Sequence, residues 1–276
     1  MSRIVSFALL ALAAASGSSS AEPGPSLQAT VAYETGPAYI LQNDGEYGAA
    51  GTRYGADDVG QQDNLALVSR TSLELAYGRH RAVFLYAPFE AKTTVTLSRD
   101  LSFRDTMFVA GTVVEHRYLF DGYRASYLYR LLDKEKVSLE VGGSLQVRNA
   151  EVAFDSQDGA LRAAENDIGL VFAAKARLWY RPAIDSWWAA LDADGFSTFG
   201  LVPGVRGAIY DVQLAAGHPV AKGVDVVFGA RLLGGGAKVE DRDIYNWANF
   251  IALTAGVRVS LDHVLGRAAR NRGDER

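Results

Sequence analysis

Apolar and polar side chains alternate with a period of two along most of the chain. The stretch from Lys136 to Phe154 illustrates the pattern, because its apolar and polar side chains fall on opposite sides of an extended backbone. The apolar set is Val137, Leu139, Val141, Leu145 and Val147, and the polar set is Ser138, Glu140, Ser144, Gln146 and Arg148. This period predicts β-strands with one apolar face and one polar face.

Similar segments recur from one end of the sequence to the other. They cover residues 65–77, 123–131, 168–180, 187–196, 224–232 and 247–261, with weaker examples at 27–35, 81–97 and 207–217. Helical periodicity is nowhere sustained. We predict about ten strands within a range of roughly 8–12, because residues 98–120 form either an extended hairpin or an additional strand pair.

The connections between these segments differ in length. Polar turns near residues 79, 133, 183 and 220 are short, whereas the stretches 36–64, 98–120, 156–166, 198–206 and 235–246 are longer. Strands of about 10–14 residues suit a tilted bilayer crossing, whereas the strands of soluble proteins are commonly about 5–6 residues long. The pattern therefore predicts an all-β fold, an antiparallel up-and-down transmembrane β-barrel with short periplasmic turns and long extracellular loops. Its apolar face would meet lipid, and its polar face would line the lumen.

Aromatic residues gather beside the short turns. Amphipathic rings are favoured at the membrane interface, so we predict an aromatic girdle there. Its predicted members are Tyr77, Tyr127, Tyr129, Trp179, Tyr180, Trp187 and Trp188.

With these patterns the chain resembles the small Gram-negative outer-membrane β-barrel proteins over nearly all of its expected mature length. The stretches "DGYRASYLYRLL" and "LEVGGSLQVRNAEVAF" resemble uncharacterised members of that class, so the resemblance implies a porin-like fold and no particular activity. Such proteins usually finish on an aromatic residue, whereas this chain continues from Asp262 through "HVLGRAARNRGDER".

Three regions are expected. Residues 1–21 read as a signal peptide, with Arg3, an apolar stretch from Ile4 to Ala15 and a small-residue cleavage site. Residues 22–261 form the barrel, and 262–276 form a short charged tail. The expected location is the outer membrane, with its lipid, lipopolysaccharide and assembly machinery as partners. A net charge of −4 without a basic stripe argues against nucleic acid.

The polar faces of the predicted strands carry both signs of charge. The predicted lumen charges are Arg70, Glu74, Arg124, Arg130, Glu140, Arg148, Lys175, Arg177, Asp192, Asp194, Asp211, Asp225, Arg231 and Arg258. A barrel of about ten strands is little wider than one that side chains fill, so paired charges would largely plug it. This predicts a structural or loop-binding role, with a narrow channel for small polar solutes as the alternative. A soluble carrier would need an apolar interior.

One strand pairing can be predicted in detail. If the turn after residue 181 spans Pro182 to Asp185, antiparallel counting places Lys175 directly opposite Asp192. Both residues belong to the polar face of their segment. We therefore expect an ion pair between them inside the barrel.

Catalytic motifs are absent from the sequence, and no metal or cofactor is expected. His80, His218 and His263 lie at predicted periplasmic turns or in the tail, so His116, next to Glu115, is the one histidine expected on the loop side. A single loop histidine is usually a solvated side chain. We therefore expect a non-enzymatic protein, with an outer-membrane hydrolase acting on lipid A, phospholipid or protein as the second alternative.

Overall fold

The computed structural model of the chain describes residues 26–62, 64–183 and 185–262. The expected signal peptide and all but the first residue of the expected tail lie outside these residues. His263 also lies outside them. The barrel predicted for residues 22–261 can therefore be compared with the structure over nearly all of its length.

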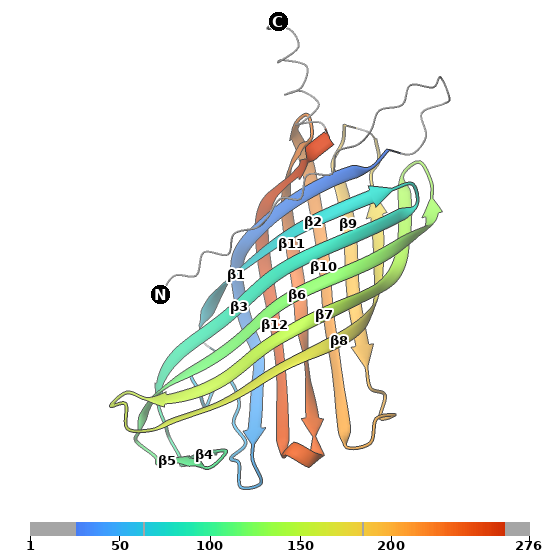
Figure 1. Cartoon of the computed structure of the whole chain (residues 1–276). Helices are drawn as coiled ribbons and strands as arrows, with labels where there is room; N and C mark the ends of the chain where they lie inside the picture. Colours follow the sequence, from blue (N-terminus) through green and yellow to red (C-terminus); the bar gives the residue numbers. More distant parts are fainter. Residues whose placement is uncertain (1–25, 63, 184, 263–276) are drawn as a thin grey trace, which may run out of the picture.

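Ten strands close into one antiparallel barrel within the described part of the chain (Figure 1). They are β1 (Gln28–Tyr47), β2 (Leu65–Tyr77), β3 (His80–Thr96), β6 (Val113–Asp133), β7 (Val137–Ser156), β8 (Arg162–Tyr180), β9 (Trp188–Ser197), β10 (Val205–Ala221), β11 (Val224–Val239) and β12 (Ile244–Ser260). Each pairs with the next barrel strand in sequence, and β12 closes onto β1. The predicted up-and-down barrel is confirmed.

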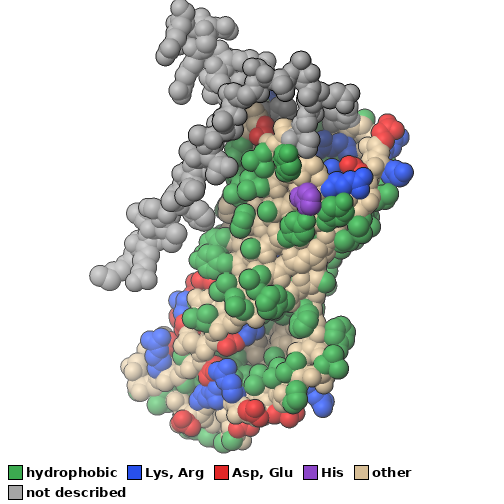
Figure 2. All heavy atoms as spheres, turned by 45° about the vertical axis from the view of Figure 1, so that its right-hand side comes forward, with side chains coloured by type: hydrophobic (Ala, Val, Ile, Leu, Met, Phe, Trp, Pro, Cys, Tyr) green, Lys and Arg blue, Asp and Glu red, His purple; other side chains and the backbone are tan. Residues whose placement is uncertain are grey.

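The outer surface of the barrel is apolar over its middle. Outward side chains such as Ile168, Leu170 and Phe172 are 73%, 65% and 64% exposed. Other exposed members of this belt are Leu67, Leu73, Phe84, Tyr123, Leu145, Leu214, Phe228 and Leu253. Figure 2 shows hydrophobic side chains spread along the body of the barrel, with charged groups gathered toward its two ends. So large an apolar surface suits contact with lipid.

The connections follow the expected division between the two ends. Residues 78–79, 134–136, 181–187 and 222–223 link strands at the end where β1 begins and β12 finishes. The opposite end carries the longer segments 48–64 and 97–112, and the second of these includes the small hairpin β4 (Leu101–Phe103) and β5 (Thr106–Phe108). Following the expectation from the sequence, we call the end with the short turns the periplasmic end and the end with the longer segments the extracellular end. A single turn of 3-10 helix, η1 (Glu240–Arg242), joins β11 to β12. No helix in the described ranges is long and apolar enough to span a bilayer.

Several strands are longer than the sequence predicts. β1 runs on to Tyr47, so the expected loop 36–64 shrinks to 48–64, and the expected loop 156–166 becomes the short turn 157–161. The added residues carry outward polar side chains, including Glu115 and Arg117 of β6. Because these positions lie beyond the apolar belt, the strands continue into water, where an outward polar side chain is well solvated.

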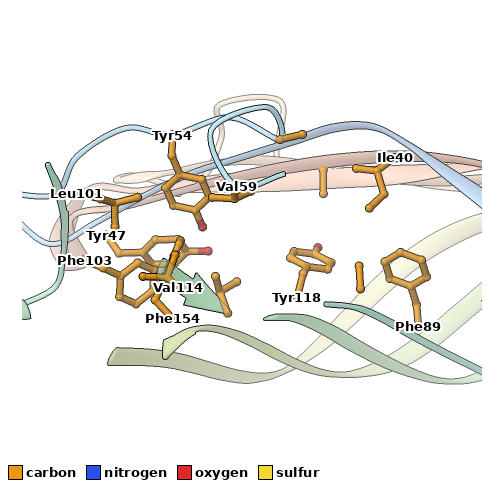
Figure 3. Close-up of a cluster of buried hydrophobic side chains, with 14 of the residues drawn as sticks. Ile40, Tyr47, Tyr54, Val59, Phe89, Leu101, Phe103, Val114, Tyr118 and Phe154 are labelled. Carbon is orange, nitrogen blue, oxygen red and sulfur yellow. The ribbon is translucent and has the colours of Figure 1, made fainter. Parts of the chain in front are cut away.

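The interior at the extracellular end is aromatic rather than charged. Segment 48–64 and the β4–β5 hairpin place rings against those of β1 and β7 (Figure 3). Ring centroids lie 4.6 Å apart for Tyr47 and Phe103, and 5.3 Å apart for Tyr54 and Phe154. This mouth core comprises Tyr47, Tyr54, Val59, Leu101, Phe103, Phe108, Val114 and Phe154. The expectation of a charged face along the whole lumen is therefore wrong for this end.

The belt predicts that the cost of a charge on the outer face depends on its position along the strand. Leu145→Arg places a cation in the belt and is expected to lower the free energy of unfolding by about 2–4 kcal/mol. Ala164→Arg, at an exposed outward position of β8 beyond the belt, is expected to cost about 1 kcal/mol or less. Urea unfolding of both variants in lipid vesicles measures the difference. Equal losses would show that the belt is misplaced.

Candidate functional site

Lys175 points into the lumen from β8 and is almost completely enclosed. Its side chain is 3% exposed, and its Nζ donates to Oδ2 of Asp194 at 2.7 Å and also to Asp192. Asp194 in turn pairs with Arg124 at 2.9 Å and accepts a hydrogen bond from the hydroxyl of Ser144. An ammonium group taken out of water needs such partners, because an unpaired buried charge is strongly unfavourable.

The register predicted around Lys175 is wrong by two residues. Lys175 lies opposite Asp194, and Arg177 lies opposite Asp192. The connection between β8 and β9 runs from Arg181 to Trp187, which is longer than the four-residue turn assumed from the sequence. Because a shift of two preserves the face on which each side chain lies, Asp192 stays in the lumen and within reach of Lys175.

Arg177 continues the ion pairs across the barrel. Its Nη1 lies 2.8 Å from Glu74 on β2, and its Nη2 lies 2.5 Å from Asp192. Glu74 also pairs with Arg81 at 2.9 Å, and Arg81 reaches Glu140 on β7 at 2.8 Å. Side chains from β2, β3, β7, β8 and β9 therefore meet in one set of contacts.

These ion pairs connect into one group, here called the luminal network. Its members are Glu74, Arg81, Arg124, Arg130, Asp133, Glu140, Lys175, Arg177, Asp192, Asp194, Asp211, Asp225, Arg231 and Arg258. Seven of these side chains are basic and seven are acidic, so their formal charges cancel. The structure thus joins twelve of the predicted lumen charges in a balanced assembly.

The two other predicted lumen charges lie outside this network. Arg148 pairs with Asp167 nearer the extracellular end. Arg70 lies opposite Glu34 in the β1–β2 register, and its buried Nε has no hydrogen-bond partner among the described residues. Sequence reasoning missed Arg81, which shares the inner face of β3 with apolar residues and so gave no charged pattern.

The predicted girdle divides into two groups. Tyr77, Tyr127, Tyr129, Tyr180 and Trp187 are exposed near the periplasmic turns. Trp179 and Trp188 are wrong as girdle members, because their rings stack inside the barrel with centroids 4.2 Å apart. The Nε1 of Trp188 donates to Asp225 at 2.9 Å, and Arg258 lies over the Trp179 ring. The alternation alone would have placed both rings inside, because Trp179 is in phase with Lys175 and Trp188 is in phase with Asp192.

A cavity of about 140 Å³ lies above the luminal network, toward the extracellular end. Its floor includes Arg124, Asp194, Asp211 and Arg231, which belong to the network. Its walls are largely apolar and come from β3, β6, β7 and β8 on one side and from β10, β11, β12 and β1 on the other. Apolar and aromatic residues in the wall include Phe89, Tyr118, Phe120, Val152, Val171, Ile209, Leu233 and Phe250.

His116 is buried against the mouth core, so the expectation of a solvated loop histidine is wrong. Its ring packs on Phe154 with centroids 4.6 Å apart, and its Nδ1 lies 2.8 Å from Nε2 of Gln61. Burial lowers the pKa of His116 to about 3. Its Nε2 has no hydrogen-bond partner among the described residues. No described carboxylate or serine hydroxyl is bonded to the ring, as a catalytic pair would require.

No family model and no curated protein matches the sequence. Among solved structures, the fold resembles outer membrane protease OmpT from Escherichia coli, with a TM-score of 0.47, 10% identity and coverage of 84% of this chain and 96% of that one. It also resembles Ail, the attachment invasion locus protein of Yersinia pestis, with a TM-score of 0.38, 13% identity and coverage of 84% and 99%. These likenesses concern the fold alone.

Two features decide the structural class of the protein, namely the closure of the barrel and the apolar belt around it. The chain forms a closed β-barrel with the architecture of outer-membrane barrels. The predicted resemblance is confirmed at the level of architecture, and the interior of the barrel holds a buried charged network.

The network predicts strong coupling between Lys175 and Asp194. Asp194→Asn is expected to lower the free energy of unfolding by about 3–5 kcal/mol, because it leaves buried cations without a carboxylate. The double variant Lys175→Met, Asp194→Asn is expected to recover about 1–3 kcal/mol relative to the sum of the single variants. Asp155→Asn, a change in an exposed pair, serves as the control and is expected to cost about 1 kcal/mol or less. Additivity within about 0.5 kcal/mol would contradict the coupling.

The buried histidine predicts a pH dependence. Between about pH 6.5 and 3 the unfolded chain binds a proton at His116 that the folded barrel does not, so acid lowers the free energy of unfolding. The contribution reaches about 1.4 kcal/mol per pH unit within this window and levels off below it. His116→Gln is expected to reduce the slope of the free energy of unfolding against pH between pH 4 and 6. The reduction corresponds to about one bound proton. Identical slopes for the parent and the variant would contradict burial of the neutral ring.

Proposed function

We propose that this barrel is a non-conducting outer-membrane binding protein, in which the luminal network seals the barrel below a small-molecule site. One observation carries the proposal. The extracellular cavity and a periplasmic vestibule of about 910 Å³ share no lining residue. Side chains that line neither space, including Glu74, Lys175 and Asp192, lie between them. The space above the luminal network therefore ends on ion pairs.

The energetics of the network favour a permanent seal. Lys175, Glu140 and Asp194 are 3%, 4% and 5% exposed, so an ion moving through this layer would have to displace paired groups that have little water to replace them. The balance of charge also matters, because a neutral layer has no excess of one sign to attract a counter-ion. Both features favour binding over passage of small polar solutes.

The proposal also assigns no enzymatic activity. His116 is enclosed by the mouth core and is neutral above about pH 3, and His80 donates or accepts a hydrogen bond with Tyr127 near the periplasmic turns. Neither geometry offers a base beside a nucleophile at the extracellular rim. The proposed partners are outer-membrane lipid, lipopolysaccharide and the assembly machinery, together with a ligand of the extracellular cavity.

Planar-bilayer recording tests the seal. The parent protein is expected to show no conductance steps above the bare bilayer. Lys175→Ala, Asp192→Ala removes an adjacent base and acid without changing the net charge, and it is expected to introduce steps. The matched pair Arg162→Ala, Asp155→Ala at the extracellular end is expected to leave the barrel closed. Steady conductance by the folded parent protein would reject the proposal and favour a channel.

A further inference from the structure

One strand of the barrel has an open edge. β8 pairs with β7 from Arg162 to Tyr180, but it pairs with β9 only from Ala174 onward. Residues 162–173 of β8 therefore have no strand partner on the β9 side within the described chain. Figure 1 shows β8 swinging away from the β9–β10 hairpin as both run toward the extracellular end. We call this unpaired segment the β8 edge.

Part of the β8 edge lies at the height of the apolar belt. Its outward side chains Ile168, Leu170 and Phe172 are all more than 60% exposed. The apolar outer face runs from Ile168 to Tyr180, which is about 40 Å along the strand and about 28 Å along the membrane normal at a tilt of about 45°. That height is close to the apolar band of about 25 Å in such barrels. Residues 168–173 therefore face the outer part of the hydrocarbon.

An open edge at this height conflicts with the rule that hydrocarbon tolerates no unpaired backbone. N–H and C=O groups that point away from β7 along this segment have no strand to receive them, and lipid tails offer no hydrogen bonds. Non-helical backbone of this kind is tolerated where it borders a cavity that holds water or ligand. The cavity above the luminal network lies behind this edge.

The opening is lined by residues from both sides of the barrel. The inward residues Glu165, Asp167 and Val171 of the β8 edge line the cavity, and a Cβ at Gly169 would meet no atom within 4 Å. The opposite wall includes Ile209 of β10 and the bare backbone of residues 234–236 of β11. Open space therefore continues from the edge into the barrel.

The opening has two closed ends. Toward the periplasm, the pairing of Ala174 with Gly195 closes the sheet. Toward the extracellular side, Glu165 is bridged to Arg242 of η1 and to Arg104 of the β4–β5 turn, each at 2.7 Å. The gap is therefore a window in the barrel wall, bounded by a strand pairing at one end and by ion pairs at the other.

We propose that this window is a lateral portal through which an amphiphile with a single alkyl chain passes between the outer leaflet and the cavity. A window at hydrocarbon height is reached by molecules dissolved in the bilayer rather than by ions in water. Phe89, Phe120 and Phe250 offer an apolar surface for the chain. The cavity of about 140 Å³ is close to the size that holds benzene, so it takes one end of the amphiphile while the rest of the alkyl chain lies in the window. Arg148, which lines the cavity and pairs with Asp167, offers a guanidinium for the polar group.

This portal names the ligand class of the proposed binding site and rests on the sealed lumen. The two ideas fail in different experiments, because a leak would appear as conductance, whereas entry from the leaflet appears as contact with acyl chains. Cysteine is absent from the chain, so a single introduced thiol carries a label at one place.

Quenching by brominated lipid tests the portal. Gly169→Cys on the inner face, Leu170→Cys on the outer face and Ser138→Cys in the periplasmic vestibule are each labelled with bimane. The labelled proteins are reconstituted in phosphatidylcholine vesicles with or without bromine on the acyl chains. Quenching at position 169 is expected to reach at least half of that at 170, while the label at 138 stays unquenched. Val171→Cys provides a second inner position if the first variant folds poorly.

The outcomes separate the alternatives. A label at 169 or 171 that behaves like the label at 138 would overturn the portal, because acyl chains would then stop at the wall. If the labels at 169, 170 and 171 are all unquenched, a second copy of the chain covers the β8 edge. This result would also overturn the portal. Adding Val171→Phe to the Gly169→Cys variant narrows the cavity, and it is expected to reduce the inner quenching by half while leaving 170 unchanged.

Discussion

The structure depends on one constraint, which is that backbone N–H and C=O groups surrounded by hydrocarbon must pair with one another. A sheet satisfies it by closing, and β1 paired with β12 completes the circle. Closure separates an outer face that meets lipid from an inner face that does not, so the alternation of side chains follows. The β8 edge matters because it departs from this constraint at a place where a cavity lies behind the wall.

The inner face raises a second problem, which is how to accommodate charge away from bulk water. The luminal network solves it by matching bases to acids across strands far apart in sequence, as Glu74 of β2 does with Arg177 of β8. Each member has a partner, so the desolvation of the charges is offset within the layer. The mouth core fills the extracellular end in a different way, with aromatic packing that leaves His116 neutral.

The architecture was predictable because period-two alternation depends only on which side of a strand a residue occupies. Alternation placed Lys175 and Asp192 on the lumen face, where the structure also has them. Their register was wrong because it depended on the length of one turn. For Trp179 the alternation was right and the interpretation was wrong. We assigned this residue to the girdle because it lies beside a turn, although the alternation places its ring inside the barrel. The burial of His116 by segment 48–64 depends on tertiary packing that has no local pattern.

The central claim, that pairing organises the barrel and that the β8 edge is its exception, can be tested by hydrogen exchange in lipid vesicles. The amides of residues 174–180 are paired on both sides, so they are expected to be protected strongly. Amides between residues 163 and 173 that point away from β7 are expected to exchange much faster, at alternate positions. Equal protection along the whole of β8 would contradict the account, because it would mean that the edge is paired.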